Sequence, residues 1–465
     1  MYWVYPRKII NITFKGLKML GQIKKVAKKS RMIRLIHSKC FNAYKRLQIS
    51  LIKKRDEAFL KHKRCDTSQL KVLFIVIHAP VWKVDSVFQK MLTDNHFYPY
   101  ILVAPFIKKG KIQMQQNMDE TYHYFRKKGY PVVKAQKDGK WIDVEAEISP
   151  DIVFFTNPHN LTMKLYYTEL YKKYVSYYVP YSHQISRYND YYNQYNQLFH
   201  NVMRRIFSPH MINKEIHENY SDNQGDNVEV TGYPAMEPFM DNNYQASNPW
   251  KKQNKQKFKI IWAPHHTIDS PSLPYANFLK YAEFFQSLVE QYKETVQWAF
   301  KPHPLLKAKL FNHPEWGKEK TDAFWDFWQN HPNCQLENDE YVDLFLTSDA
   351  MIHDSGSFLA EYLYTNNPVL FMVSSPNIQD YFNPIGCKAF EACYHAKQSQ
   401  DITNFIENLI AGNDTMKENR LKFLEKDIFP FFQDKMPSDR IIESIKKDFG
   451  LVKNGRGEIY NVFIK

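Results

Sequence analysis

Four short segments of this sequence place polar side chains directly after apolar runs that are typical of buried strands. They are Ile261-Trp-Ala-Pro-His-His-Thr267, Phe300-Lys-Pro-His-Pro304, Ile352-His-Asp-Ser-Gly-Ser357 and Val179-Pro-Tyr-Ser-His-Gln184. Lysine, histidine and serine side chains in such loops bind phosphate oxygens and move protons. These residue types therefore indicate chemistry on a phosphorylated substrate.

The segment from Asp354 to Ser357 ends an expected strand and begins an expected helix. The first N–H groups of a helix have no internal partners and carry the positive end of its dipole. The glycine lets a ligand approach closely and the serines add hydroxyl donors, so we expect a phosphate or diphosphate here. The phosphate-binding candidates are Ser355, Gly356 and Ser357. Asp354 is expected in the same cleft. Glu361, one turn into the helix, is expected to accept hydrogen bonds from a ribose diol. The structural alternative for the segment from Asp354 to Ser357 is an ordinary helix N-cap without a ligand.

Lys301 and His303 follow another apolar run, within a rigid segment that contains two prolines. A lysine and a protonated histidine both stabilise charge on a leaving phosphate. His265 and His266 are expected to contact one of the two substrates, the group donor or the acceptor. His183 or His265 is the candidate general base. The expected catalytic residues are therefore His183, His265 and His303. No acidic or cysteine ligand stands at a metal-like spacing near the histidine pair, so we expect no metal ion and no other cofactor. A solvated lysine and packed histidines are the structural alternative.

The apolar runs alternate with polar, helix-compatible stretches, which is the pattern of a parallel sheet with crossover helices. The expected strands are 71–78, 100–104, 131–135, 151–155 and 174–179, followed by 258–263, 295–300, 349–353 and 368–373, and the expected helices of the second series are 275–292, 321–330, 356–366 and 401–425. The α/β pattern therefore predicts two Rossmann-like domains that face a cleft, where ligands bind at the carboxyl ends of the strands. The expected parts are a basic helical extension (1–64), an N-terminal domain (65–237), a polar linker (238–257), a C-terminal domain (258–440) and a tail (441–465).

The composition limits the class of protein. The chain has 465 residues, of which 44% are hydrophobic and 24% charged, as in ordinary soluble proteins with two or three domains. No apolar run approaches the ~20 residues that span a bilayer, and residues 1–30 lack the apolar core of a secretory signal. The five cysteines show no Cys-x-x-Cys spacing, which argues against a disulfide framework or a cysteine zinc site and favours a reducing cytoplasm.

The positive charge is concentrated at the N-terminus. Residues 1–64 hold 19 of the 63 Lys and Arg residues and two of the 49 acidic residues, which gives this segment a formal charge of +17 and the remainder −3. Apolar residues recur there at helical steps: Leu17, Leu20, Ile23 and Ala27, then Ile33, Ile36, Cys40, Tyr44 and Leu47. A basic amphipathic helix binds an anionic membrane surface, and each basic residue contributes on the order of 1 kcal/mol. An alternative is that this helical segment packs on its own domain and leaves its basic face in solvent. Nucleic-acid binding by the same charge is the weakest of the three hypotheses, and we expect no nucleic-acid partner.

Four segments together resemble the CDP-glycerol glycerophosphotransferase family, whose members build teichoic acids and related capsular or surface polymers. They are Val230-Thr-Gly-Tyr-Pro234, Trp262-Ala-Pro264, Lys301-Pro-His-Pro304 and the stretch SDAMIHDSGSFLAEYLYTNNPVLFM at 348–372. The resemblance covers about residues 180–375 by motif and 70–180 only by pattern. It implies a GT-B fold, with the donor nucleotide bound mainly by the C-terminal domain and the acceptor by the N-terminal domain, and attachment to the cytoplasmic face of a bacterial membrane.

The resemblance also implies roles for particular residues. Lys301 and His303 would contact the donor diphosphate, and Ser355 and Ser357 would cradle it. Family members usually carry a His-Gly pair in the first half, and the matching place here is Ser182-His183-Gln184, which lacks the glycine. Many relatives have Arg-x-His where this chain has Lys301-Pro-His303, a form that also resembles certain bacterial Kdo transferases of capsule synthesis.

We therefore expect a transferase that moves glycerol phosphate, or a similar polyol phosphate, from a CDP-activated donor to a hydroxyl group of a cell-surface polymer or lipid-linked glycan. A GT-B glycosyltransferase that uses a UDP-sugar or CMP-Kdo in capsule or exopolysaccharide synthesis is the alternative, since both reactions need the same phosphate-binding residues. A third hypothesis is a membrane-tethered binding protein with a degenerate site, which predicts binding without turnover. The expected partners are CDP-glycerol or a related donor, a glycan or polyol-phosphate acceptor, and an anionic membrane surface at residues 1–64.

Overall fold

The computed structural model describes residues 31–64, 68–108, 110–187, 191–268, 270, 273–338 and 340–452, in a chain that divides into two compact units, 1–65 and 66–465. The first unit contains the helix α2 (Arg31–Lys63), which confirms a helical N-terminal segment. The expected helical positions before residue 31 lie outside the described residues. Along α2 the apolar side chains of Phe41, Leu47 and Leu51 are exposed, and Leu47 keeps 53% of its surface. None of the described helices is long and apolar enough to cross a membrane.

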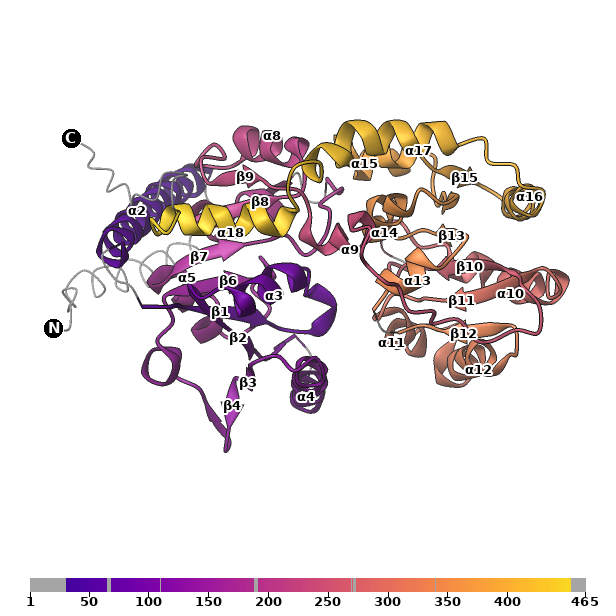
Figure 1. The fold of residues 1–465 in the computed structure, drawn as a ribbon, viewed down its shortest axis with the longest axis horizontal. Helices are drawn as coiled ribbons and strands as arrows, with labels where there is room; N and C mark the ends of the chain where they lie inside the picture. Colours follow the sequence, from indigo (N-terminus) through magenta and orange to yellow (C-terminus); the bar gives the residue numbers. More distant parts are fainter. Residues whose placement is uncertain are drawn as a thin grey trace. The chain divides into compact units, whose positions relative to one another are not determined.

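The second unit contains two sheets of parallel strands (Figure 1). The N-terminal sheet has the order β3-β2-β1-β6-β7-β8-β9, and every neighbouring pair runs parallel. Its strands are β1 (Leu70–Val76), β2 (Phe97–Val103), β3 (Val132–Lys134), β6 (Ile152–Phe155), β7 (Val175–Tyr178), β8 (Arg205–Ser208) and β9 (Val228–Val230). A short antiparallel hairpin, β4 (Gln136–Lys137) with β5 (Lys140–Trp141), lies beside it in sequence. The strand order changes direction between β1 and β6, which is where ligands bind in such sheets.

The C-terminal sheet repeats this arrangement with the order β12-β11-β10-β13-β14-β15. Its strands are β10 (Phe258–Ala263), β11 (Val296–Phe300), β12 (Cys334–Leu336), β13 (Ala350–His353), β14 (Val369–Met372) and β15 (Tyr394–Ala396). All neighbours are parallel, and the strand order changes direction between β10 and β13. The loops after β10, β11 and β13, which carry the expected chemistry, therefore leave the same edge of one sheet.

Helices connect the strands of both sheets, and Figure 1 shows α10 and α12 beside the C-terminal sheet. The helices of the N-terminal half are α3 (Asp85–Thr93), α4 (Lys111–Lys127), α5 (Thr168–Lys173), α6 (Tyr192–Tyr195), α7 (Leu198–Val202), α8 (Met211–Tyr220) and α9 (Glu237–Met240). Those that follow are α10 (Phe278–Gln291), α11 (Leu306–Phe311), α12 (Gly317–Asn330), α13 (Val342–Leu346), α14 (Gly356–Glu361), α15 (Pro384–Glu391), α16 (Ser399–Ile410), α17 (Lys417–Phe423) and α18 (Pro437–Asp448). α14 continues into a short 3-10 helix, η7 (Tyr362–Thr365).

The expected strands are present, whereas the single helix expected at 401–425 is wrong: α16 ends at Ile410, a turn with Gly412 at a φ of 75° follows, and α17 begins at Lys417. The other differences concern short or returning segments. The strands β8, β12 and β15 are only three or four residues long and have no distinctive apolar run. In the expected linker, Trp250 is buried and its indole donates to Thr347 Oγ1 at 3.0 Å, so this segment packs on the C-terminal half. The helix α18 crosses the expected boundary at 440, and Asp448 accepts a hydrogen bond from Tyr177 of β7 at 2.9 Å. The chain therefore returns to the N-terminal half at its end.

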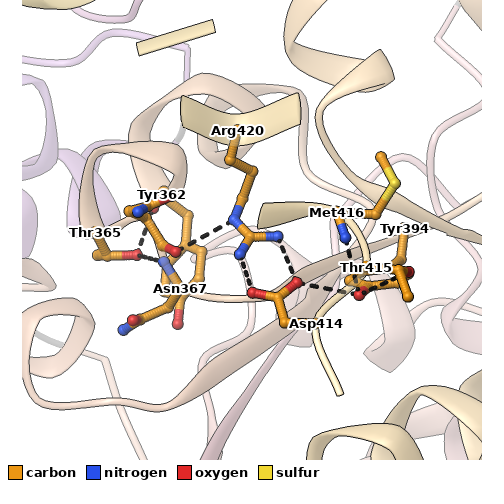
Figure 2. A network of polar contacts seen from close by, with 9 residues as sticks. Tyr362, Thr365, Asn367, Tyr394, Asp414, Thr415, Met416 and Arg420 are labelled. Atoms are coloured by element: carbon orange, nitrogen blue, oxygen red, sulfur yellow. Dashed lines mark hydrogen bonds and ion pairs between the residues drawn. The ribbon is translucent and has the colours of Figure 1, made fainter. Parts of the chain in front are cut away.

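A buried ion pair fixes the helical segment that carries part of the expected site (Figure 2). The side chain of Arg420, on α17, is fully buried and makes a two-pronged contact with the carboxylate of Asp414, with one bond of 3.1 Å. Arg420 Nε also donates to the backbone oxygen of Asn366 at 3.2 Å. Asn366 ends η7 in the left-handed conformation, with a φ of 56°. The arginine thus satisfies the carboxyl end of the α14–η7 segment, whose other end begins at Ser355.

Candidate functional site

The loops after β10 and β11 bring three histidines together. The rings of His266 and His303 stack with centroids 3.9 Å apart and planes at 13°. The ring of His265 lies 4.4 Å from that of His266 and 5.1 Å from that of His303. Backbone hydrogen bonds continue the pairing of the two strands into these loops, from Lys301 N to Trp262 O at 2.8 Å and from His303 N to Pro264 O at 3.0 Å. The main chain therefore sets the geometry of the cluster.

The backbone determines which nitrogen of His303 carries the proton. The amide of Leu305 donates to His303 Nδ1 at 3.1 Å, so Nδ1 accepts and the proton of the neutral ring lies on Nε2. Burial, with a smaller contribution from nearby groups that include Lys309, lowers the pKa of His303 to about 3 and that of His266 to about 4. At neutral pH these rings are uncharged. His303 therefore presents an N–H donor without a net charge.

The same hydrogen bond bears on metal binding. The ligand nitrogens of His265, His266 and His303 lie within 4.8 Å of one another, which is close enough for three ligands of one metal ion. A metal ligand must offer a lone pair, whereas the Leu305 amide leaves the proton of His303 on the only nitrogen that remains open. The donor set is therefore better suited to an anion than to a cation.

Lys301 is the lysine of the same loop. It is buried, directly after β11 and two residues before His303. A lysine ammonium offers three donors to phosphate oxygens, and its interaction with an anion strengthens as water is excluded. Lys301 and the histidine cluster thus combine one positive charge with neutral donors at one edge of the sheet.

Asp354, expected in the cleft, is fully buried and organises the loop after β10. Its carboxylate accepts hydrogen bonds from the backbone N–H groups of His265 at 2.6 Å and Asn277 at 2.5 Å. Burial raises the pKa of Asp354 to about 7, although these hydrogen bonds act in the opposite direction. Both carboxylate oxygens are occupied by the chain itself. Asp354 therefore positions His265, a connection that the sequence pattern did not reveal.

The segment at the start of α14 is partly occupied by protein contacts. The backbone N–H of Ser355 donates to Nδ1 of His353 at 3.1 Å. Gly356 is buried, and a Cβ atom there would lie 3.2 Å from the ring of Tyr275. Ser357 is exposed. The glycine is thus required by packing against Tyr275 as well as by any approach of a ligand.

Glu361, at the end of α14, is a buried carboxylate in an unusual position. Its carboxylate interacts with the hydroxyl of Tyr341 and with Lys83. Lys83 Nζ, from the N-terminal half, lies 3.9 Å from Oε2 and donates to the hydroxyl of Tyr341 at 2.8 Å. Burial raises the pKa of Glu361 and lowers that of Lys83, while their mutual attraction opposes both shifts. Sequence analysis missed Lys83, because it lies seven residues after the end of β1 and not directly after it, as the residues of the other loops do.

His183 lies in a different environment from the three clustered histidines. It is buried, and its Nε2 lies 2.8 Å from the hydroxyl of Tyr364 on η7. Its ring stacks on that of His210 with centroids 5.4 Å apart. Burial lowers the pKa of His183 well below its usual value. His183 is therefore neutral, with Nε2 occupied by Tyr364 and Nδ1 buried without a hydrogen-bond partner among the described residues.

A model of the family described as CDP-Glycerol:Poly(glycerophosphate) glycerophosphotransferase matches residues 166–447. The matched region contains the histidine cluster, Lys301, α14 and His183. No curated protein sequence matches this chain.

Solved structures resemble the fold at low sequence identity. The wall teichoic acid polymerase TagF with CDPG shares 13% identity over 87% of this chain and 97% of that chain, with a TM-score of 0.55. The S. aureus MnaA-UDP co-structure shares 18% over 83% and 98%, with a TM-score of 0.53. A putative UDP-N-acetylglucosamine 2-epimerase from Listeria monocytogenes shares 16% over 83% and 98%, with a TM-score of 0.53. These likenesses and the two sheets confirm the expected GT-B-like architecture.

Proposed function

This chain belongs to the CDP-glycerol:poly(glycerophosphate) glycerophosphotransferase family, and we propose that it transfers glycerol phosphate, or a similar polyol phosphate, from a CDP-activated donor to a hydroxyl group of a teichoic-acid-like polymer, capsule or lipid-linked glycan. The observation that carries the proposal is the N–H donor of His303, which the Leu305 amide orients within a cluster of three histidines in the loop that also carries Lys301. Such donors suit a diphosphate group, and CDP-glycerol, the donor in the name of the family, contains one.

In the proposed reaction, the acceptor oxygen attacks the phosphorus atom that bears the glycerol. A new P–O bond forms, the bond to the bridging oxygen of CMP breaks, and the acceptor proton passes to a base. Lys301 and His303 donate to the diphosphate oxygens, so they stabilise the charge that develops on the leaving CMP. The protein supplies position and electrostatics, as phosphoryl transfer requires.

His265 and His183 are the candidates for the base, and the contacts favour His265. Nδ1 of His265 lies 2.9 Å from the hydroxyl of Thr267, and the ring adjoins those of His266 and His303. A base there is close to the proposed diphosphate site. His183 is buried, and its Nε2 already contacts Tyr364.

We assign the donor nucleotide to α14. The carboxylate of Glu361 would accept hydrogen bonds from the ribose hydroxyls in place of its present contacts with Lys83 and Tyr341. The backbone at Gly356 and the hydroxyls of Ser355 and Ser357 would face the phosphates. Lys83 would have to move away from Glu361 when the ribose binds.

The first unit fits a peripheral contact with an anionic membrane at the inner face of the cell membrane. Residues 1–64 carry a formal charge of +17. Phe41, Leu47 and Leu51 add exposed apolar side chains on α2. Apolar groups that enter the interface and basic groups that stay near lipid phosphates together give reversible membrane binding.

A donor panel tests the proposed reaction. Purified protein is incubated with a short polyol-phosphate acceptor and, separately, CDP-glycerol, CDP-ribitol, CMP-Kdo or UDP-sugars, and the released nucleotide is quantified by chromatography. We expect CMP to be released from a CDP-polyol only when the acceptor is present. The rate of CMP release should fall ~10²-fold in Lys301→Met, because a side chain that stabilises the developing charge is lost. Lys293→Met, at an exposed lysine on the same half, is the matched control and keeps full activity. Release only from CMP-Kdo or a UDP-sugar would reject the proposal and establish a glycosyltransferase.

A further inference from the structure

A pocket lies on the N-terminal half, between α5 and the short helices α6 and α7. It has a volume of about 320 Å³. Small-molecule sites in proteins range from roughly 300 to 1,000 Å³, so this pocket is large enough for one small ligand. None of the residues assigned to the donor lines it.

The pocket is built from two segments that leave neighbouring strands. Asn160, Tyr167 and Thr168 belong to the segment that follows β6, and Tyr192 belongs to the segment that follows β7. Ligands of parallel α/β sheets bind outside the carboxyl ends of the strands. The pocket therefore belongs to the functional edge of the N-terminal sheet.

An aromatic cluster forms a rigid wall of the pocket. The rings of Tyr167 and Phe199 stack with centroids 5.4 Å apart and planes at 9°. Tyr171 meets Tyr167 edge-on at 5.3 Å, and the hydroxyl of Tyr167 donates to the backbone oxygen of Pro158. These side chains are already ordered, so little conformational entropy is lost when a ligand binds.

The backbone before Tyr192 presents that ring to the pocket. Tyr191 has a φ of +67°, which is uncommon for a residue other than glycine and costs on the order of 1–3 kcal/mol. The ring of Tyr191 is buried against Tyr195, with centroids 5.5 Å apart. The next residue, Tyr192, lines the pocket and keeps 47% of its surface exposed. An exposed aromatic ring held next to a strained residue offers a stacking surface.

The lining of the pocket identifies the chemistry of its ligand. No Lys, Arg, Asp or Glu is among the described residues that line it, which does not suit a phosphate. A sugar ring has an apolar C–H face, which buries well on an aromatic ring, and hydroxyl groups at its edge. Asn160 and Thr168 offer an amide and a hydroxyl at the rim.

We propose that this pocket, with Tyr192 as its stacking ring, binds an uncharged sugar ring of the acceptor. The assignment to the acceptor rests on the proposed function, whereas the sugar binding itself does not. The acceptor is then a glycan whose sugar is held by the N-terminal half, while its hydroxyl reaches the donor on the C-terminal half.

Ligand-observed NMR titrations test the proposal on the full chain. The probes are methyl β-D-glucopyranoside and methyl N-acetyl-β-D-glucosaminide, with glycerol 3-phosphate as the charged comparison. We expect saturation transfer to at least one glycoside, an affinity about fivefold lower in Tyr192→Ala since a stacking contact is lost, and a similar loss in Thr168→Val. Tyr98→Ala is the control, because Tyr98 is 57% exposed and lies on β2, outside the pocket. Glycerol 3-phosphate should not displace the glycoside.

Equal glycoside binding in the wild type, Tyr192→Ala and Thr168→Val would overturn the proposal, as would no binding of either glycoside. CDP-glycerol binding, measured on the same samples, separates the two assignments. CMP release from a CDP-polyol without sugar binding would reject the pocket and keep the proposed function. Sugar binding that depends on Tyr192, in a protein that consumes no CDP-polyol, would keep the pocket and reject the proposed function.

Discussion

We expect the folded protein to be sensitive to mild acid, because it buries neutral histidines. His210, His217 and His353 are buried, and burial lowers their pKa values to about 4, 3 and 3. In the unfolded chain a histidine titrates near its usual pKa of about 6.5. Between these values the unfolded state binds more protons than the folded state, so stability is complete above pH 6.5 and falls as the pH falls.

The expected loss follows from these pKa values. At pH 5.0 each of the three histidines is protonated in the unfolded chain and neutral in the folded one, which costs about 2 kcal/mol per group relative to pH 7.5. Together they lower the free energy of unfolding by about 6 kcal/mol, a large part of the 5–15 kcal/mol typical of a folded protein. Urea titrations at pH 7.5 and pH 5.0 measure the sum of all such contributions, to which His266 and His303 add in the same direction, whereas Asp354, whose raised pKa favours the folded state as the pH falls, acts in the opposite direction.

A single substitution isolates one of these contributions. Neither ring nitrogen of His217 has a hydrogen-bond partner in the described part of the chain, so His217→Leu removes a titrating group without breaking a polar contact. The variant should lose about 2 kcal/mol less than the wild type between pH 7.5 and pH 5.0. His123→Leu, at an exposed histidine on α4, is the control and should behave like the wild type. An unchanged pH dependence in His217→Leu would refute the reasoning.

Three further expectations concern the metal, the membrane and the fold. Transferase activity should survive EDTA treatment and dialysis, because Leu305 leaves His303 as a donor; loss of activity that zinc restores would establish a metal site. Removal of residues 1–64 should abolish cosedimentation with vesicles that contain phosphatidylglycerol; unchanged binding would exclude this segment as the anchor. Arg420→Met should lower the free energy of unfolding by ~1.5–3 kcal/mol, because Asp414, which is partly exposed, and the backbone oxygen of Asn366 lose their charged donor. Lys388→Met, which breaks an exposed pair, should cost at most ~1 kcal/mol, and equal losses would contradict this account.

The sequence predicted the part of the site that depends on strand order alone. Apolar runs identified β10, β11 and β13, and parallel strands place the residues after their carboxyl ends at one edge. This is why His265, His266 and His303 could be assigned to one site before their contacts were known. The stacking of two rings and the proton on Nε2 of His303 could not be predicted, because they depend on side-chain rotation and on one backbone amide.

Contacts between segments far apart in the chain were beyond the sequence pattern. Lys83 and Glu361 are 278 positions apart, and only the folded halves bring their charges to 3.9 Å. His183 and Tyr364 meet in the same way. Asp354 looked like a ligand-binding residue because it follows a strand, yet backbone amides of its own half occupy it. Residue type and spacing thus identify the edge of the sheet, but not which polar group the protein itself satisfies.

The balance of one charged lysine and neutral imidazoles has a consequence for turnover. A site with several cations would stabilise the anionic donor, the transition state and the CMP product together, and uniform stabilisation does not raise kcat. The backbone amide of Leu305 fixes the orientation of the Nε2–H group of His303. A hydrogen-bond donor held in this way stabilises most strongly the charge that grows as the bond to CMP breaks. His303→Asn should therefore lower kcat by ~10²-fold and change KM for the donor by less than about threefold. Steady-state kinetics measure both constants. A variant in which KM rises and kcat is unchanged would show that His303 contributes only to binding the donor.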